Sequence, residues 1–126
     1  MPTKGRSATL CRMVPGEDVI LTNLRRGVLE HCILAMLEHD QLYGLDIARK
    51  LSDEGLLLSS EGTLYPLLAR LRKAGLVKTS WQESDEGPPR RYYALTAEGR
   101  SSLAAFKRTW KPFRNAVDTA LSGGQP

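Results

Sequence analysis

The chain has 126 residues, 41% of them hydrophobic, and this length and composition predict one globular domain with a single core. It carries 18 Lys and Arg against 14 Asp and Glu, a net charge of +4, and such a basic surplus favours a polyanionic partner. No stretch approaches the roughly 18 apolar residues of a membrane span, and the N-terminus lacks the apolar run of a signal peptide. We therefore expect a cytoplasmic protein with no membrane partner.

The residue types that carry catalysis and metal binding follow no known pattern in this sequence. Cys11 and Cys32 lack CxxC spacing, so they predict neither a zinc site nor a redox pair. His31 and His39 have no partnered nucleophile, and no phosphate-binding loop or metal motif occurs. The sequence thus predicts a protein that is not an enzyme and that has no metal and no cofactor.

The N-terminal segment mixes proline and glycine with charges and shows no sustained apolar period. This composition predicts a flexible arm over residues 1–21. From Leu24 onward, apolar residues recur at helical spacing and predict a first helix, for which Thr22 or Asn23 is available as the N-cap.

Two shorter helices are expected next. The second helix follows Gly44 and ends before Gly55, and its buried face is formed by Leu45, Ala48 and Leu51. Ser60 can cap a third helix, which Gly75 ends. The buried stripe of this third helix consists of Leu64, Leu68 and Leu71. Three helices in this order predict a helix-turn-helix unit.

A β-hairpin is expected after the third helix. Residues 76–82 and 91–95 are rich in β-branched and aromatic side chains, which is typical of strands. The segment between them is polar, ends on a basic residue and contains Pro88 and Pro89, which cannot donate to a strand ladder and therefore belong in the loop. This pattern indicates the wing of a winged helix.

The last expected helix spans residues 97–121, with Thr96 as its N-cap. Its capping box is incomplete because position 99 is Gly instead of Glu. An apolar stripe runs along this helix at spacings of three or four, formed by Leu103, Phe106, Trp110, Phe113, Val117 and Leu121. A chain this small has little core left for them, so a second copy is expected to cover the stripe. Residues 122–126 are expected to be a disordered tail.

Three sequence blocks resemble the PadR family of repressors, and the resemblance spans roughly residues 24–121. The blocks are YGLDIARKL at residues 43–51, TLYPLLARL at 63–71 and RRYYALTAEG at 90–99. The resemblance implies a mainly α fold with a small β-hairpin. A winged helix-turn-helix domain is then expected over residues 22–96, followed by a C-terminal dimerisation helix over residues 97–121. The single short C-terminal helix is similar to the smaller subclass of the family.

Double-stranded DNA is the partner that this fold predicts, because the N-terminal end of a recognition helix enters the major groove. The residues that we expect at DNA are Ser60, Gly62, Thr63, Tyr65, Arg70, Lys73, Arg90 and Arg91. The resemblance implies the place of Tyr65 on the DNA side, and the alternative is packing beside Leu68. Ser60 can also act as a plain N-cap, and the basic side chains can also form a solvated surface.

A small aromatic effector is the second predicted partner. The resemblance includes small repressors whose dimer interface holds flat aromatic compounds beside a tryptophan, which implies that Trp110 stacks on such a ligand. The alternative is that Trp110 only fills the core of the homodimer.

Together these features predict a transcriptional repressor that binds a palindromic operator as a homodimer and is released by a small aromatic ligand. Fold alone does not fix function, and two other classes remain open at this point. One is a winged-helix module that binds a protein, and the other is a drug-binding protein without operator binding.

Overall fold

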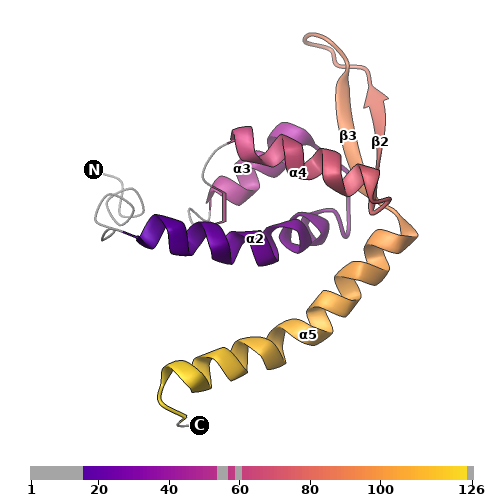
Figure 1. Cartoon of the computed structure of the whole chain (residues 1–126). Coiled ribbons are helices and arrows are strands. Elements are labelled where there is room, and N and C mark those ends of the chain that lie inside the picture. Colours follow the sequence, from indigo (N-terminus) through magenta and orange to yellow (C-terminus); the bar gives the residue numbers. More distant parts are fainter. Residues whose placement is uncertain (1–15, 54–56, 59–60, 125–126) are drawn as a thin grey trace.

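The computed structural model describes residues 16–53, 57–58 and 61–124. Its elements in chain order are α2 (Glu17–Met36), β1 (Leu42–Tyr43), α3 (Gly44–Asp53), α4 (Glu61–Lys73), β2 (Val77–Gln82), β3 (Arg90–Leu95) and α5 (Ala97–Leu121). Figure 1 shows α2, α3 and α4 packed together, the β2–β3 hairpin projecting from them and the long last helix α5. The predicted fold class is therefore confirmed.

The core lies between α2, α3, α4 and the sheet. Its largest fully buried side chains are Ile33, Leu34, Leu37, Ile47, Leu51, Leu64, Leu68, Leu71 and Val77. Full burial of one such aliphatic side chain is worth about 1.5–3 kcal/mol. The predicted stripe of α4 is thus confirmed, and it orients the opposite face of α4 outward.

The hairpin is part of a three-stranded antiparallel sheet with the order β1-β3-β2. Leu42 pairs with Tyr93, and Thr79 pairs with Tyr93 from the other side. Strand β1 was not predicted, because two residues are too short to show alternation. This short strand joins the wing to the start of α3.

The first described helix begins earlier than expected. Its first residue is Glu17 rather than Leu24, so residues 17–21 of the predicted arm are helical. Residues 1–15, the rest of that arm, lie outside the described residues. The apolar period did not predict these first turns of α2, because Val19 and Ile20 are both exposed and do not belong to the core face.

The expected N-caps of this helix are also wrong. Thr22 and Asn23 lie inside α2, where the Thr22 hydroxyl donates to the Asp18 carbonyl over 2.9 Å. Gly16 stands at the N-cap with a φ of 98°, a conformation that glycine adopts without steric cost. Acidic Glu17 and Asp18 occupy the first turn, where negative charge is stabilised by the helix dipole.

Helix α5 is fastened to the domain at its first turn. The Thr96 hydroxyl accepts a hydrogen bond from Gly99 N over 3.0 Å and donates one to the Gly75 carbonyl over 2.6 Å. The predicted cap is therefore confirmed. A Cβ on Gly99 would overlap the carbonyl oxygen of Leu76 and lie 2.9 Å from Cδ2 of Leu95. The capping box lacks its glutamate because there is no space for a side chain at position 99.

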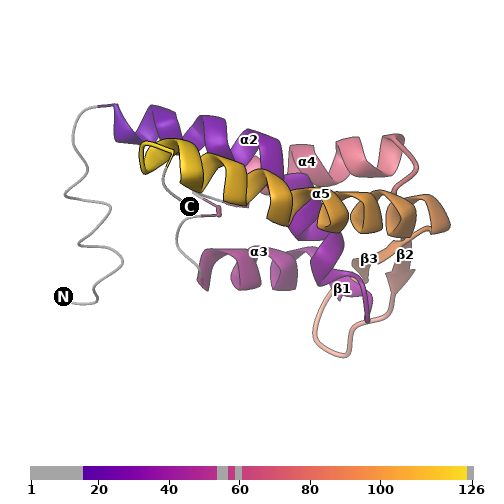
Figure 2. The same ribbon diagram turned by 90° about the horizontal axis from the view of Figure 1, so that it is seen from below.

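The first half of α5 packs along the second half of α2, and then the two helices diverge (Figures 1 and 2). At the junction, the His31 ring stacks on Phe106 with centroids 4.4 Å apart, and its Nε2 lies 3.1 Å from the Ser102 hydroxyl. Leu103 is 3% exposed and belongs to the core of the chain itself. Among the described residues, no helix is long and apolar enough to cross a membrane.

Replacing Gly99 tests this attachment. Gly99→Ala is expected to lower the free energy of unfolding by about 1–3 kcal/mol, because an added methyl group forces backbone apart in a packed region. Thermal or urea unfolding measures the change. The matched control is Gly27→Ala in α2, where a Cβ meets nothing within 4 Å. This control should be stabilising by about 0.5–1 kcal/mol, and equal stability of the two variants would contradict the close approach at Gly99.

Candidate nucleic-acid interface and apolar groove

Tyr65 lies on the outer side of α4 near the start of α3. It is 45% exposed, and a Cβ at Gly44 would lie 3.2 Å from its Cε1. Partial burial, assisted by the negative charge of Glu61, raises the pKa of the Tyr65 hydroxyl. The ring is thus half packed, while the hydroxyl stays protonated and able to donate a hydrogen bond to an anion.

The other predicted positions of α4 are split between two environments. Gly62, Thr63 and Lys73 are exposed, and Thr63 borders the same cleft between α2 and α4 as Arg70. Arg70 instead forms an ion pair with Glu30 of α2, so its guanidinium is turned toward the flank of α4 that faces α2. Ser60, the remaining prediction, lies outside the described residues.

The two arginines of the wing are each held over an aromatic ring. The Arg90 guanidinium lies 4.8 Å from the centroid of Tyr43, and the Arg91 guanidinium lies 4.8 Å from the centroid of Trp81. Such cation–π contacts restrict a flexible side chain and leave the edge of the guanidinium available for an anion. Arg90 pairs with Gln82 and Arg91 with Trp81, the two pairs next to the loop. Since successive residues of a strand point to opposite faces, the two arginines lie on either side of the base of the wing loop, which we call the root of the wing.

The tip of the wing has the opposite charge. Glu83, Asp85 and Glu86 lie in the loop and are exposed. Close approach of these carboxylates to a phosphate backbone is repulsive. Arg90 lines the same surface pocket as these carboxylates, so positive and negative side chains lie next to each other where β3 leaves the loop.

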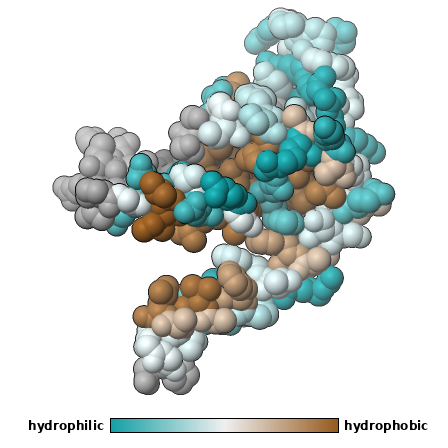
Figure 3. Space-filling view, viewed as in Figure 1, coloured by the Kyte–Doolittle hydropathy of each residue, from teal (hydrophilic) through white to brown (hydrophobic). Residues whose placement is uncertain are grey.

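An apolar groove opens where α2 and α5 diverge. Figure 3 shows apolar surface on both helices across the gap, and the cavity between them measures about 530 Å³. Its walls include Leu24 and Val28 from α2 and Trp110, Phe113 and Val117 from α5. Phe113 is 60% exposed and Trp110 is 38% exposed, so a large apolar surface lacks cover within one chain.

The predicted interface residues do not all lie on this groove. The prediction that Leu103 lies at the dimer interface is wrong, because Leu103 is buried in the core of its own chain. Phe106 is intermediate, with its ring stacked on His31 and 5.8 Å from the ring of Trp110. Trp110, Phe113, Val117 and Leu121 are exposed.

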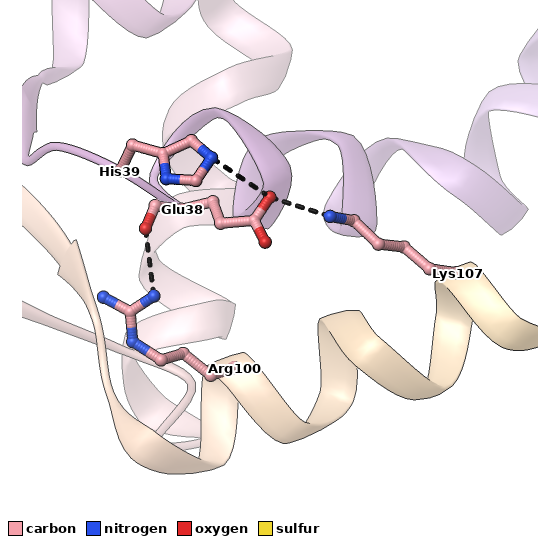
Figure 4. Close-up of polar contacts among 4 residues, drawn as sticks. All are labelled: Glu38, His39, Arg100 and Lys107. Carbon is pink, nitrogen blue, oxygen red and sulfur yellow. Dashed lines mark hydrogen bonds and ion pairs between the residues drawn. The ribbon is translucent and has the colours of Figure 1, made fainter.

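A polar cluster around Glu38, called here the clasp, connects the chain after α2 to the first half of α5 (Figure 4). The Glu38 carboxylate accepts a hydrogen bond from Lys107 Nζ over 2.8 Å, and the Glu38 carbonyl accepts one from Arg100 Nη1 over 2.9 Å. The bond from Lys107 lowers the pKa of Glu38. These contacts join the end of α2 to the first half of α5 and so limit the angle at which the two helices diverge.

Comparison with known proteins decides the family. The sequence profile of the PadR-like family of transcriptional regulators matches residues 33–105. The chain belongs to this family. It is 36% identical to a PadR-like transcriptional regulator of Bacillus cereus, whose crystal structure matches with a TM-score of 0.71 over 79% of this chain and 96% of that chain. It is also 33% identical to a transcriptional regulator of Mycobacterium tuberculosis, over 77% of this chain and 89% of that protein.

A similar PadR structure has been solved with nucleic acid. It is Bacillus subtilis PadR in complex with operator DNA, 27% identical, with a TM-score of 0.57 over 63% of this chain and 46% of that chain. The present PadR-like chain is accordingly a DNA-binding transcriptional regulator of winged helix-turn-helix fold. Membership in a family of regulators also confirms that it is not an enzyme.

Several residues of this PadR-like regulator were missed by sequence reasoning. Tyr43 and Trp81, which support the wing arginines, were not assigned to the interface, because their partners become neighbours only through strand pairing. The Glu38 clasp joins residues 69 positions apart. Arg25 and Arg26 of α2 were likewise not considered, and they lie beside α4.

Proposed function

We propose that this PadR-like regulator represses transcription by binding a palindromic operator as a homodimer. The observation that carries the proposal is the pairing of an outward-facing α4 with a wing whose root holds Arg90 and Arg91 on aromatic rings. A recognition helix in the major groove and basic side chains at flanking phosphates are the usual division of labour in such a domain. The similar Bacillus subtilis PadR is solved in complex with operator DNA, which supports an operator as the partner.

The contacts proposed for one protomer fall into two groups. The N-terminal part of α4 supplies Gly62, Thr63 and Tyr65, with Lys73 further along the same helix, and Ser60, which lies outside the described residues, is kept as a predicted contact. Backbone N–H groups and hydroxyls at the start of a helix suit a phosphate or a base edge. The wing supplies Arg90 and Arg91 for phosphates.

The homodimer is supported by the uncovered apolar groove. The exposed part of the stripe on α5 and the facing side of α2 present aromatic and aliphatic side chains that a second copy is suited to cover. A two-fold interface is self-complementary, so the same groove serves both chains. Such a dimer has to place its two α4 helices about 34 Å apart to reach successive major grooves.

A ligand is proposed for the same groove. Phe106 and Trp110 are stacked with their rings 13° from parallel, which leaves an aromatic face suited to a flat aromatic compound. Such a ligand releases DNA only if it binds the arrangement of the two recognition helices that does not fit the operator more tightly than the one that does. The clasp at Glu38 is the contact through which a change in the groove reaches the DNA-binding domain.

Removal of the wing arginines tests DNA binding. The double variant Arg90→Ala and Arg91→Ala should weaken duplex binding and reduce the slope of log K against log salt concentration by about two, since each lost phosphate contact removes close to one. Fluorescence anisotropy with a labelled duplex over a salt series measures both. The control is Arg108→Ala on α5. Unchanged affinity and slope in the double variant would show that the wing does not contact DNA.

The ligand proposal is tested with a flat aromatic dye. Binding of anilinonaphthalene sulfonate, followed by its own fluorescence, should weaken roughly fivefold or more in Trp110→Ala, because one aromatic stack contributes about 1 kcal/mol. Trp81→Ala is the matched control, since Trp81 is exposed on the wing. Equal dye affinity in the wild type and Trp110→Ala would assign Trp110 to the dimer core alone.

A further inference from the structure

A second cleft lies between α2 and α4, on the side of the domain away from the apolar groove of α5. It measures about 390 Å³, and Figure 1 shows the two helices that border it. Its floor is apolar and consists of Leu29, Leu57 and Leu67, while its rim is polar and carries two threonines and several charged side chains. Of the residues that line this cleft, only Thr63 and Arg70 were predicted DNA contacts, and only Thr63 belongs to the contacts proposed above for the wing and α4.

Three arginines surround the cleft. Arg25 and Arg26 come from α2 and Arg70 comes from α4, while Glu30 is the one carboxylate among the lining residues. The lining therefore carries a formal charge of +2, from three positive groups and one negative group. Guanidinium groups present several N–H donors in a fixed plane, which matches the oxygens of a phosphate. The charge and the donors together fit an oxyanion.

Two of the three arginines are exposed side chains that are oriented by a polar partner. Arg26 Nη1 donates a hydrogen bond to Asn23 Oδ1 over 3.0 Å, and Arg70 is paired with Glu30. Each of these partners takes up part of one guanidinium and leaves other N–H groups of the fork for a further acceptor. Side chains fixed in this way lose less conformational freedom when an anion binds.

The position of the cleft indicates where the anion comes from. Thr63 lies in the first turns of α4 and also lines the cleft, so the cleft borders the part of the helix that is proposed to enter the major groove. Phosphates form both walls of that groove. When α4 lies in the major groove, the phosphates that line the groove on the side of α2 pass the opening of the cleft.

We propose that this cleft binds a backbone phosphate of the operator, on the strand that borders the major groove beside α2. This inference rests on the proposed function. It adds Arg25 and Arg26 of α2 to the DNA contacts and gives Arg70 a shared role with them. Glu30 orients Arg70, but its negative charge also repels the phosphate. It therefore lowers the affinity for DNA of any base sequence.

The test uses two substitutions with opposite expected effects. Arg26→Ala should weaken binding of a duplex several-fold at about 0.1 M salt and lower the salt slope by about one. Glu30→Gln should tighten binding and leave the melting temperature equal or lower, because the ion pair with Arg70 is lost. A variant that loosens the fold does not bind DNA more tightly, so the second result separates an electrostatic role from a structural one.

Charge-matched controls lie on α5. Arg108→Ala and Asp118→Asn change the net charge by the same amounts as the two test substitutions, and both residues are exposed. If Arg26→Ala and Arg108→Ala change the slope equally, the effect is one of net charge only and the cleft is not at the DNA. If inorganic phosphate raises the melting temperature of the wild type but not of Arg26→Ala while the DNA slopes agree, the cleft binds a free anion, which also overturns the proposal.

Failure of this inference is distinguishable from failure of the proposed function. If the salt slope falls in the Arg90 and Arg91 double variant but not in Arg26→Ala, the winged helix binds DNA and only the proposal for the cleft is wrong. Absence of any salt-dependent duplex binding by the wild type would instead remove both.

Discussion

The attachment of α5 to the winged helix determines most of what this chain can do. The first turn of α5 is pressed against the backbone at Leu76, which only a glycine at position 99 permits. Leu103 is then buried in the core and Glu38 holds Arg100 and Lys107. Because these contacts occupy only the first half of the helix, the second half extends past the domain. Its aromatic side chains are left facing α2 across an open groove.

Helix α5 is attached to the domain through its first half, so a force on its second half changes the angle between α5 and the domain. Whatever covers or fills the groove acts on the free half of α5, and the clasp at Glu38 and the stacked rings of His31 and Phe106 lie between that half and the domain. In a two-fold dimer, a small change of this angle alters the separation of the two recognition helices. The requirement for fixed half-site spacing makes that separation the quantity to which DNA binding is most sensitive.

Basic and acidic side chains are unevenly distributed over the surface of the domain. Arginines lie at the root of the wing and, in the proposal above, along the cleft between α2 and α4, while the acidic residues Glu83, Asp85 and Glu86 occupy the wing tip. The net charge of +4 does not reveal this arrangement. Close approach of these carboxylates to a DNA phosphate is repulsive, so the proposed contacts are assigned to Arg90, Arg91 and α4.

The helices and the hairpin were predictable because burial imposes a period on their sequences, as for Leu64, Leu68 and Leu71. The start of α2 was not, since Val19 and Ile20 are exposed and follow no core period. The assignment of Leu103 to an interface was wrong because periodicity identifies an apolar face without saying what covers it. The pairs of Arg90 with Tyr43 and of Arg70 with Glu30 depend on tertiary proximity, which spacing along the chain does not encode.

The most direct test of this account is the solution mass of the chain, measured by sedimentation equilibrium together with that of Phe113→Asp. Phe113 is exposed in the groove, so a charge there opposes burial against a second copy. The account predicts twice the 14.0 kDa of one chain for the wild type and a shift toward a single chain for the variant, with the fold of the domain retained. A wild type that sediments as one chain at micromolar concentration, with the groove still open, would contradict it.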